Sequence, residues 1–317
     1  MSIESMQPIY LDDNRSASDV NVRVTMPISP ADEKRIAKEL SPGVAWPTLV
    51  LAIVLPSLTV GVVWLGLAGL VPLWVCTIIL TFATYGHYTL THESVHGNLV
   101  PAHPKLRWLN DVVGWISALG QGLNWPMLMR AHLMHHSHTN TDEDPDIWVK
   151  GGFAMLLLKS VLMSIVVTIP LFILRYLSPK DYKMAVRDLR GSEVIQSDVV
   201  AVAVLVLLAI AIPTGHFMDW LFLLFLPSRL GGTLLAIFFS WLPHHPFDST
   251  ERYLNTRVSL WPCAGLLTFQ QNLHLMHHLW PSVPFYNYGR LYQRLRPNLI
   301  AKGSRIEGLR PMKAANI

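Results

Sequence analysis

Three clusters of histidine are the residues in this sequence best suited to chemistry. The 317-residue chain holds 14 histidines. On a helix, residues at i, i+3 and i+4 share one face, so each cluster directs two or three imidazoles the same way. Imidazole nitrogen is a ligand for iron, zinc, copper and nickel. The clusters are His92-Glu-Ser-Val-His96, His132-Leu-Met-His135-His136 and His274-Leu-Met-His277-His278.

A neighbouring pair, His244-His245, follows a long apolar segment and adds further nitrogen donors. Eight to ten histidines exceed what one metal ion uses, so the sequence predicts two metals with about four or five nitrogens each. Adjacent residues on a helix point about 100° apart, so only one of this pair is expected to face the metals.

The elements that must position these clusters are membrane helices. Only 15% of the residues are charged, against about 25% in a typical soluble protein. No Asp, Glu, Lys or Arg occurs from Leu40 to His92, and an uncharged apolar run of that length is typical of membrane spans. The predicted spans are 44–65, 72–92, 199–218 and 230–245.

A fifth apolar segment, 153–174, is predicted to lie at the membrane interface or re-enter, rather than to cross. Five cations follow it within residues 175–197, and a single crossing would place them outside, against the positive-inside tendency. With four spans, 23 of the 25 Lys and Arg residues fall on the cytoplasmic side with both termini.

The sequence thus predicts an all-α membrane protein with four transmembrane helices, an interfacial helix and a cytoplasmic helical cap that carries the histidine clusters. Residues 1–43 would form a polar cytoplasmic segment, 44–300 the membrane domain and 301–317 a C-terminal tail.

Several other classes of protein are disfavoured by composition. Only Cys76 and Cys263 occur, which excludes a disulfide framework, an iron–sulfur centre and a cysteine zinc site. No nucleotide-binding fingerprint is present. The isoelectric point near 9.1 is explained by basic cytoplasmic loops rather than by nucleic-acid binding.

The order HxxxH, HxxHH, HxxHH after an uncharged hairpin resembles the membrane fatty-acid desaturase superfamily. The stretch Arg130–Trp148 (RAHLMHHSHTNTDEDPDIW) looks like the second histidine cluster, or box, of that family, followed by the Thr-Asn and Asp-Pro-Asp residues that form its trailer. Residues Gln271–Tyr286 (QNLHLMHHLWPSVPFY) look like its third box and are nearest to the β-carotene hydroxylase branch. Trp241-Leu-Pro-His244 resembles the Leu-Pro-His of carotenoid enzymes, which favours His244 over His245 as an extra ligand.

The resemblance implies a non-haem di-iron oxidoreductase that uses O2 to oxidise a C–H bond of a long lipid. The expected substrate is a fatty-acyl chain, which would be desaturated; a carotenoid ring, which would be hydroxylated, is the alternative. No cytochrome b5 motif is fused to the chain, so electrons would come from a separate ferredoxin, rubredoxin or cytochrome b5-type donor with its reductase. The implied iron ligands are His92, His96, His132, His135, His136, His244, His274, His277 and His278. The acidic residues that follow the second box, Asp142, Glu143, Asp144 and Asp146, are expected to orient ligand imidazoles. The preferred candidates to contact the ligands, rather than the metals, are Glu93, His138, Asp142, Asp146 and His245.

Two other classes compete for parts of the pattern. His92-Glu93-Ser-Val-His96 also fits the HExxH motif of a membrane zinc metalloprotease, in which the glutamate is the general base. A protease would need one further ligand, however, and not two more triple-histidine clusters. A haem cytochrome would hold its histidines inside spans on facing helices, whereas these clusters lie at helix ends and in loops.

Overall fold

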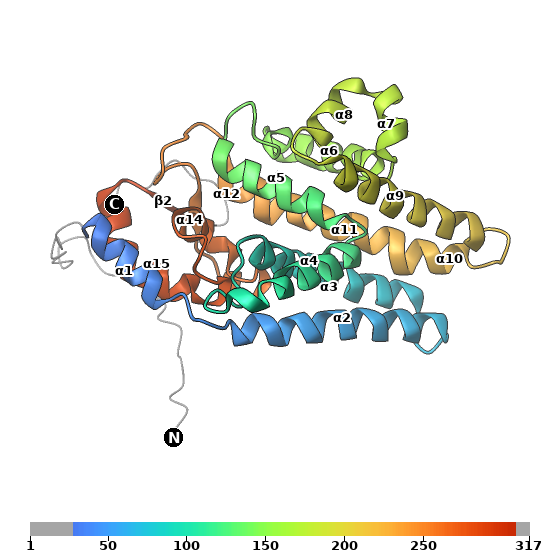
Figure 1. Cartoon of the computed structure of the whole chain (residues 1–317), viewed down its shortest axis with the longest axis horizontal. Coiled ribbons are helices and arrows are strands. Elements are labelled where there is room, and N and C mark those ends of the chain that lie inside the picture. Colours follow the sequence, from blue (N-terminus) through green and yellow to red (C-terminus); the bar gives the residue numbers. More distant parts are fainter. Residues whose placement is uncertain (1–27, 309–317) are drawn as a thin grey trace, which may run out of the picture.

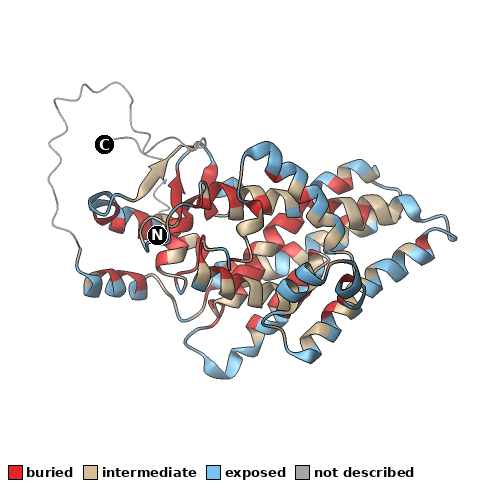
Figure 2. Cartoon of the chain, turned by 90° about the horizontal axis from the view of Figure 1, so that it is seen from above, coloured by how far each residue is buried: buried red, intermediate tan, exposed pale blue. Residues whose placement is uncertain are grey.

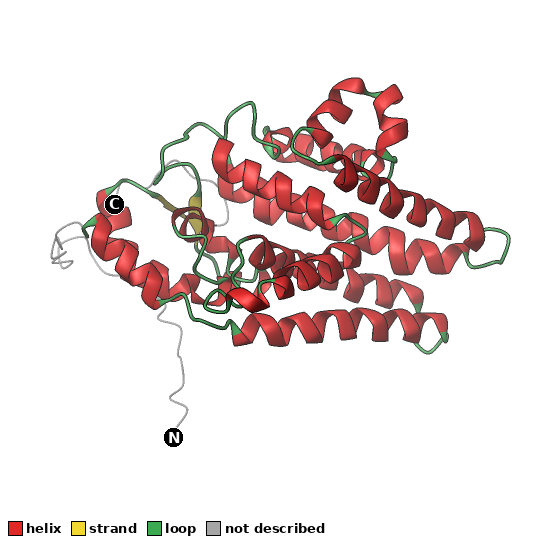
Figure 3. Ribbon diagram, viewed as in Figure 1, coloured by secondary structure: helices red, strands yellow, loops and turns green. Residues whose placement is uncertain are grey.

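Most of the described chain, residues 28–308, is helical in this computed structural model, and loops make up nearly all of the rest (Figure 3). The N-terminal and C-terminal expectations for residues 1–27 and 309–317 fall outside the described residues. Within them, the only strands are β1 (Arg257–Ser259) and β2 (Arg305–Glu307), which pair in parallel. This short pairing joins residues that were expected to form the C-terminal tail to the segment after the last span.

Within residues 28–308, four helices are long and apolar enough to cross a membrane, which confirms the predicted all-α membrane architecture. They are α2 (Trp46–Leu67), α3 (Leu73–Val95), α9 (Gly191–Ala211) and the continuous helix Phe217–His244. The last comprises α10 (Phe217–Trp220), η3 (Leu221–Phe225), α11 (Leu226–Leu235), η4 (Ala236–Trp241) and α12 (Leu242–His244).

The predicted boundaries of the third and fourth spans were wrong. The third begins at Gly191 rather than at 199, because its charged residues are satisfied within the fold: Glu193 caps the helix start and Asp198 accepts the backbone N–H of Phe172. The fourth begins near Phe217 rather than at 230. Pro227 does not break this helix. The π-helical turn η3 comes directly before α11 and accommodates the backbone hydrogen bond that a proline cannot donate.

Helix α3 is the most buried of the four spans, while α2 and α9 expose most of their apolar side chains. Figure 2 shows buried residues gathered in the interior of the bundle and exposed ones on its outer helices. Exposed apolar surface of this extent is what lipid tails cover in a membrane protein. Against α3, α11 makes a close approach at Gly231, where an added Cβ would stand 2.6 Å from Thr84 Cγ2. Small residues at such contacts let membrane helices pack backbone to backbone.

The segment 153–174 does not form one straight span. Helices α6 (Phe153–Val166) and α7 (Leu171–Leu177) meet at an angle of 119°, with Pro170 capping the second. The start of α6 packs beside Trp241, whose indole donates to Gly151 O at 2.8 Å, and its end receives the Arg229 guanidinium at Ser164 O, also at 2.8 Å. Trp241 and Arg229 are separated by about 18 Å along their helix. Of the two predicted arrangements, these contacts favour the re-entrant one.

The remaining helices assemble mainly at one end of the bundle. They are α1 (Pro30–Glu39), η1 (Pro104–Leu106), α4 (Trp108–Gly120), α5 (Trp125–His138), η2 (Ile147–Val149), α8 (Pro179–Val186), α13 (Ala264–Leu267), η5 (Gln271–Leu273), α14 (His274–Leu279), η6 (Phe285–Asn287) and α15 (Tyr288–Ala301). Figure 1 shows α1, α12, α14 and α15 toward one end and the α2–α3 and α9–α10 turns at the other. The ends of α3, α5 and α12 that carry histidines meet at the first end.

This topology predicts where cysteine labels should react. In a background without Cys76 and Cys263, Arg187→Cys should be labelled by an impermeant maleimide from the same side as Lys105→Cys, which precedes α6. Thr214→Cys, in the α9–α10 turn, should be labelled from the opposite side. Labelling of Arg187→Cys from the side opposite to Lys105→Cys would show that α6 and α7 cross the membrane.

A candidate metal centre built from histidine clusters

Nine histidines from four helices converge at the end of the bundle. His92 lies in the last turn of α3 and His96 caps that helix, while α12 ends at His244. The other six are supplied by α5 and α14, with three on each: His132, His135, His136, His274, His277 and His278. These are the nine residues that the sequence predicted as ligands, and the structure brings all of them together.

The first group of histidines joins the first and second clusters to His277. Its members are His92, His96, His132 and His277. The Nε2 atoms of His92 and His277 are 2.9 Å apart, as are those of His96 and His132. His136 Nε2 lies 2.7 Å from His277 Nε2 and 3.1 Å from His132 Nε2, so it borders this group as well as the next.

The second group joins His244 to the second and third clusters. Its members are His135, His244, His274 and His278. His278 Nε2 lies 3.2 Å from His274 Nε2 and 3.3 Å from His135 Nε2. Metal–nitrogen bonds of about 2.0–2.1 Å place neighbouring nitrogens about 2.9–3.4 Å apart in octahedral or tetrahedral geometry. The spacings in both groups therefore fit two metal ions.

Hydrogen bonds on the far sides of the rings show why a cation fits the second group. Imidazole Nδ1 of His135 faces Asp144 Oδ1 at 2.9 Å, and that of His244 faces Asn140 Oδ1 at 3.1 Å. These oxygens only accept, so both Nδ1 atoms carry the proton and both Nε2 atoms present lone pairs. His244 Nε2 is buried and, within residues 28–308, has no hydrogen-bond partner. Converging lone pairs repel one another unless a cation binds them.

Burial keeps most of these rings neutral, as metal ligation requires. It lowers the pKa of His132, His274 and His278 well below the ordinary histidine value, and neighbouring histidines lower it further. His135 differs. Burial would lower its pKa, but the hydrogen bond to Asp144 and the charges of Asp146 and Asp144 raise it overall. A carboxylate partner also makes an imidazole a stronger metal donor.

The turn after α5 explains how Asp144 reaches His135. Asn140 adopts a left-handed backbone (φ 64°), which Asn tolerates better than most residues. Its backbone N–H donates to Asp144 Oδ2 at 2.8 Å, and its side-chain Nδ2 donates to the backbone carbonyls of Ser249 and Asn255. The Thr-Asn and Asp-Pro-Asp trailer therefore folds back onto the second histidine group and anchors it to the segment after the last span.

Of the four acidic trailer residues that the sequence predicts to orient ligand imidazoles, Asp144 makes the contact to His135, and the two preferred candidates, Asp142 and Asp146, do not. Asp142 is exposed at the outside of the turn. Asp146 is close by but accepts the Ser240 hydroxyl at 2.8 Å, and burial raises its pKa. No sequence signal distinguished Asp144, because the turn geometry decides which carboxylate points inward.

Two candidate histidines lie outside both groups. His138 Nε2 is 3.1 Å from Glu143 Oε2 on the surface, and its Nδ1 faces Met134 O. His245 packs against Trp241, with ring centroids 4.7 Å apart and the ring planes tilted by 37°. Because residues before proline avoid the helical region, the chain leaves the helix at His245, before Pro246.

Glu93 is fully buried beside the first group but is not hydrogen-bonded to a histidine. Its Oε1 accepts the backbone N–H of Phe285 at 3.3 Å, and His92 Nδ1 is 3.7 Å away. This contact ties α3 to the segment that follows α14. It also leaves Glu93 poorly placed to activate water as the base of a protease.

The comparison with known families decides among the remaining classes. The fatty acid desaturase family matches residues 68–307. The chain belongs to this family. The matched range contains all nine converging histidines, so this member keeps the family's histidine boxes.

The chain's relatives in this family carry out two kinds of oxidation. It is 26% identical to a β-carotene ketolase of Paracoccus sp. (strain PC1) over 232 residues, 68% of this chain and 77% of the relative. It is 25% identical to an sn-1 oleoyl-lipid 12-desaturase of Anabaena variabilis over 283 residues, 80% and 77% of the two chains. A zeaxanthin 4-ketolase of Chlamydomonas reinhardtii is 24% identical over 231 residues, 71% and 45% of the two chains. This family member is thus an oxygen-dependent membrane oxidoreductase.

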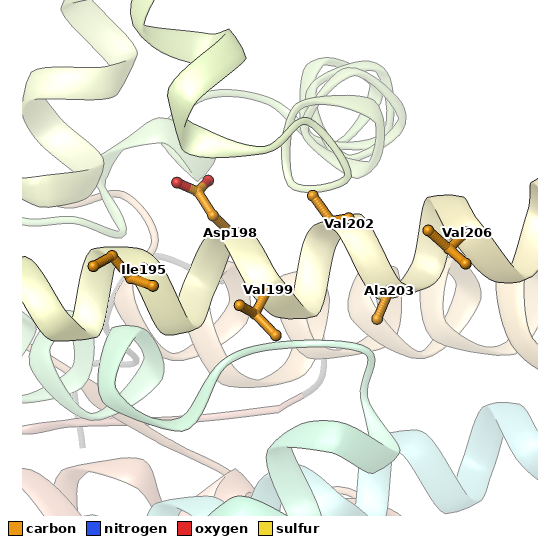
Figure 4. Close-up of a pocket in the computed structure, with 6 residues that line it drawn as sticks. All are labelled: Ile195, Asp198, Val199, Val202, Ala203 and Val206. Carbon is orange, nitrogen blue, oxygen red and sulfur yellow. The ribbon is translucent and has the colours of Figure 1, made fainter.

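Two of the hollows that residues 28–308 form lie outside the histidine groups. One is a groove on the lipid-facing side of α9, lined by apolar side chains and Asp198 (Figure 4). The other is a mostly apolar cavity of about 410 Å³ enclosed by α5, the α6–α8 segment and α9. Met134 of α5 and Asp146 line it, and Asp146 accepts a hydrogen bond from the hydroxyl of Ser240, one helical turn before His244. Part of the cavity wall is therefore formed by residues close in sequence to the second histidine group: Met134 directly precedes His135, and Asp146 follows Asp144 by two residues.

Proposed function

We propose that this desaturase-family member holds two iron ions on its histidine groups and oxidises a ring C–H bond of a carotenoid. The observation that carries the metal proposal is the division of the nine histidines into two sets of four that share a border at His136. Ketolases among the relatives support the carotenoid substrate. The sequence alone favoured an acyl chain, and these relatives shift the preference.

Iron bound at these two groups would supply the activation of O2 needed to remove hydrogen from an unactivated carbon. The chain's own residues fix the tautomers: Asp144 and Asn140 hold protons on Nδ1 of His135 and His244, which leaves Nε2 free. Burial of these rings excludes bulk water from the reacting region. Electrons are expected from a separate carrier, a ferredoxin, rubredoxin or cytochrome b5-type protein with its reductase, docking at the cytoplasmic, histidine-bearing end.

An acyl-lipid desaturase is the second candidate. The 12-desaturase of Anabaena variabilis matches the longest stretch of this chain among the three relatives described above. Removal of a second hydrogen gives a double bond and addition of oxygen gives an alcohol or ketone, and both outcomes use the same histidine groups.

Pigment and lipid profiles of one expression host separate the two candidates. A host that makes β-carotene should accumulate hydroxylated or ketolated carotenoid while its fatty acids stay unchanged. New acyl double bonds with unchanged pigment would establish the second candidate. Purified protein should contain about two iron ions per chain; a single tightly bound zinc would contradict both.

The role of Glu93 gives a further test against the protease class. Glu93→Gln keeps an oxygen that can accept the Phe285 N–H, so we expect iron to stay bound. Changes next to a metal ligand typically cost about 10–100-fold, and lipid oxidation should fall within that range. Complete inactivity at full metal occupancy would contradict the indirect role assigned to this carboxyl.

A further inference from the structure

One aromatic ring lies against both metal groups. Phe239 belongs to η4, the π-helical turn that precedes α12. Its ring centroid is 5.8 Å from that of His92, in the first group, and 6.1 Å from that of His274, in the second. Both contacts are edge-on, with interplanar angles of 67° and 80°. A molecule that packs against Phe239 is therefore held beside both groups at once.

The π-helical turn explains how Phe239 reaches the histidines. Residues five apart on an α-helix point about 140° apart, which would separate Phe239 from His244. A π turn bonds residue i to i+5, and its wider repeat moves the two side chains toward one face. Both rings contact the same partner, since the ring centroids of His244 and His274 are 5.2 Å apart. The π turn therefore sets the place of an aromatic side chain beside the metal groups.

Tyr88 of α3 forms an aromatic pair with Phe239. The two rings meet edge-on with centroids 4.7 Å apart. Tyr88 lies one turn before His92, so both side chains are on the same face of α3, and their ring centroids are 6.3 Å apart. From Ala83 to Ser94, every residue of α3 is buried except Tyr88. Part of the Tyr88 side chain therefore stays open to a bound molecule.

We propose that Phe239 and Tyr88 are specificity-determining residues that hold the conjugated end of a carotenoid beside the metal groups. This rests on the proposed function, because it takes a carotenoid as the substrate. A ring joined to a polyene is flat and presents π-faces to aromatic side chains, as another aromatic ring would. A saturated acyl chain offers only apolar area to the same rings. The pair therefore favours a conjugated substrate and selects the ring carbon that faces the metals.

The test measures β-carotene binding to the metal-free, detergent-solubilised full chain by the shift of the carotenoid absorption band. Phe239→Leu and Tyr88→Leu keep apolar bulk but remove the aromatic ring. Each should weaken β-carotene binding by about 10-fold, the upper end for loss of an aromatic contact. An oleoyl lipid should then displace β-carotene more readily than it does from the wild type. Both variants should still bind two Co²⁺ ions, a stand-in for Fe²⁺, since neither side chain is a ligand.

Phe238→Leu is the matched control. Phe238 is the neighbouring residue in the same π turn, but its ring centroid lies 6.4 Å from that of Tyr85 and 6.3 Å from that of Trp261. Within residues 28–308 it pairs with no histidine, so this variant should bind β-carotene as the wild type does. Tyr88→Phe separates the ring from its hydroxyl and should keep the binding that Tyr88→Leu loses.

Three results would overturn the proposal: unchanged β-carotene binding in Phe239→Leu and Tyr88→Leu, an equal loss in Phe238→Leu, or loss of Co²⁺ from either ring variant. The last would make the rings supports of the histidines rather than contacts to substrate. In the first two cases, wild-type protein that binds β-carotene leaves the proposed function standing. Wild-type protein that binds an oleoyl lipid and not β-carotene would overturn the carotenoid proposal together with this inference.

Discussion

Alanine in place of His244 should cost the protein the metal of its second histidine group and abolish lipid oxidation. His244 is 1% exposed, its Nδ1 is held by Asn140, and its Nε2 faces His135, His274 and His278. Removing it leaves that group with three of its four grouped nitrogens. Iron content should fall from about two to about one per chain, because each site uses about four or five nitrogens.

His245→Ala is the matched control for this prediction. The two residues are adjacent, yet His245 packs against Trp241 outside the histidine groups. We expect His245→Ala to retain both iron ions and most activity. Iron loss in His245→Ala with retention in His244→Ala would reverse the assignment. Full iron in both would mean that the second group binds its metal without a ligand from the last span.

The histidine boxes could be predicted from sequence because helical spacing alone puts their imidazoles on shared faces. The preference for His244 over His245 also agrees with where the structure places the two rings; its role as a ligand stays a prediction. Here a local rule sufficed, since the proline after His245 ends the helix and turns that ring away.

The residues that hold the boxes could not be predicted in the same way. Asp144, rather than Asp142, reaches His135 because Asn140 turns the chain through a left-handed conformation, which a run of acidic residues does not reveal. Tyr288 meets His277 only through the packing of α15 on α14. The span boundaries failed for a related reason: Glu193 and Asp198 lie within α9 because partners elsewhere in the fold satisfy them.

The same reasoning predicts a large effect at Asp144. Asp144→Leu removes the acceptor of His135 Nδ1 and also that of the backbone N–H groups of Asn140 and Asp146. His135 would lose its fixed tautomer, and the turn that supplies Asn140 to His244 would loosen. Two ligands of one group are affected together, so we expect metal affinity at the second group to fall by about 100-fold, the upper end for such partners.

Asp142→Leu removes a carboxylate two residues away that is exposed and bonds neither histidine, so it should leave both metal sites intact. Asp144→Asn separates the orienting effect of Asp144 from the effect of its charge, because an amide oxygen still accepts from His135 while the negative charge is lost. Retention of both metals in Asp144→Asn would show that orientation of His135 matters most, and loss equal to that of Asp144→Leu would assign the effect to charge. Unchanged metal affinity in Asp144→Leu would contradict the prediction, since the contact at 2.9 Å would then have no part in holding the metal.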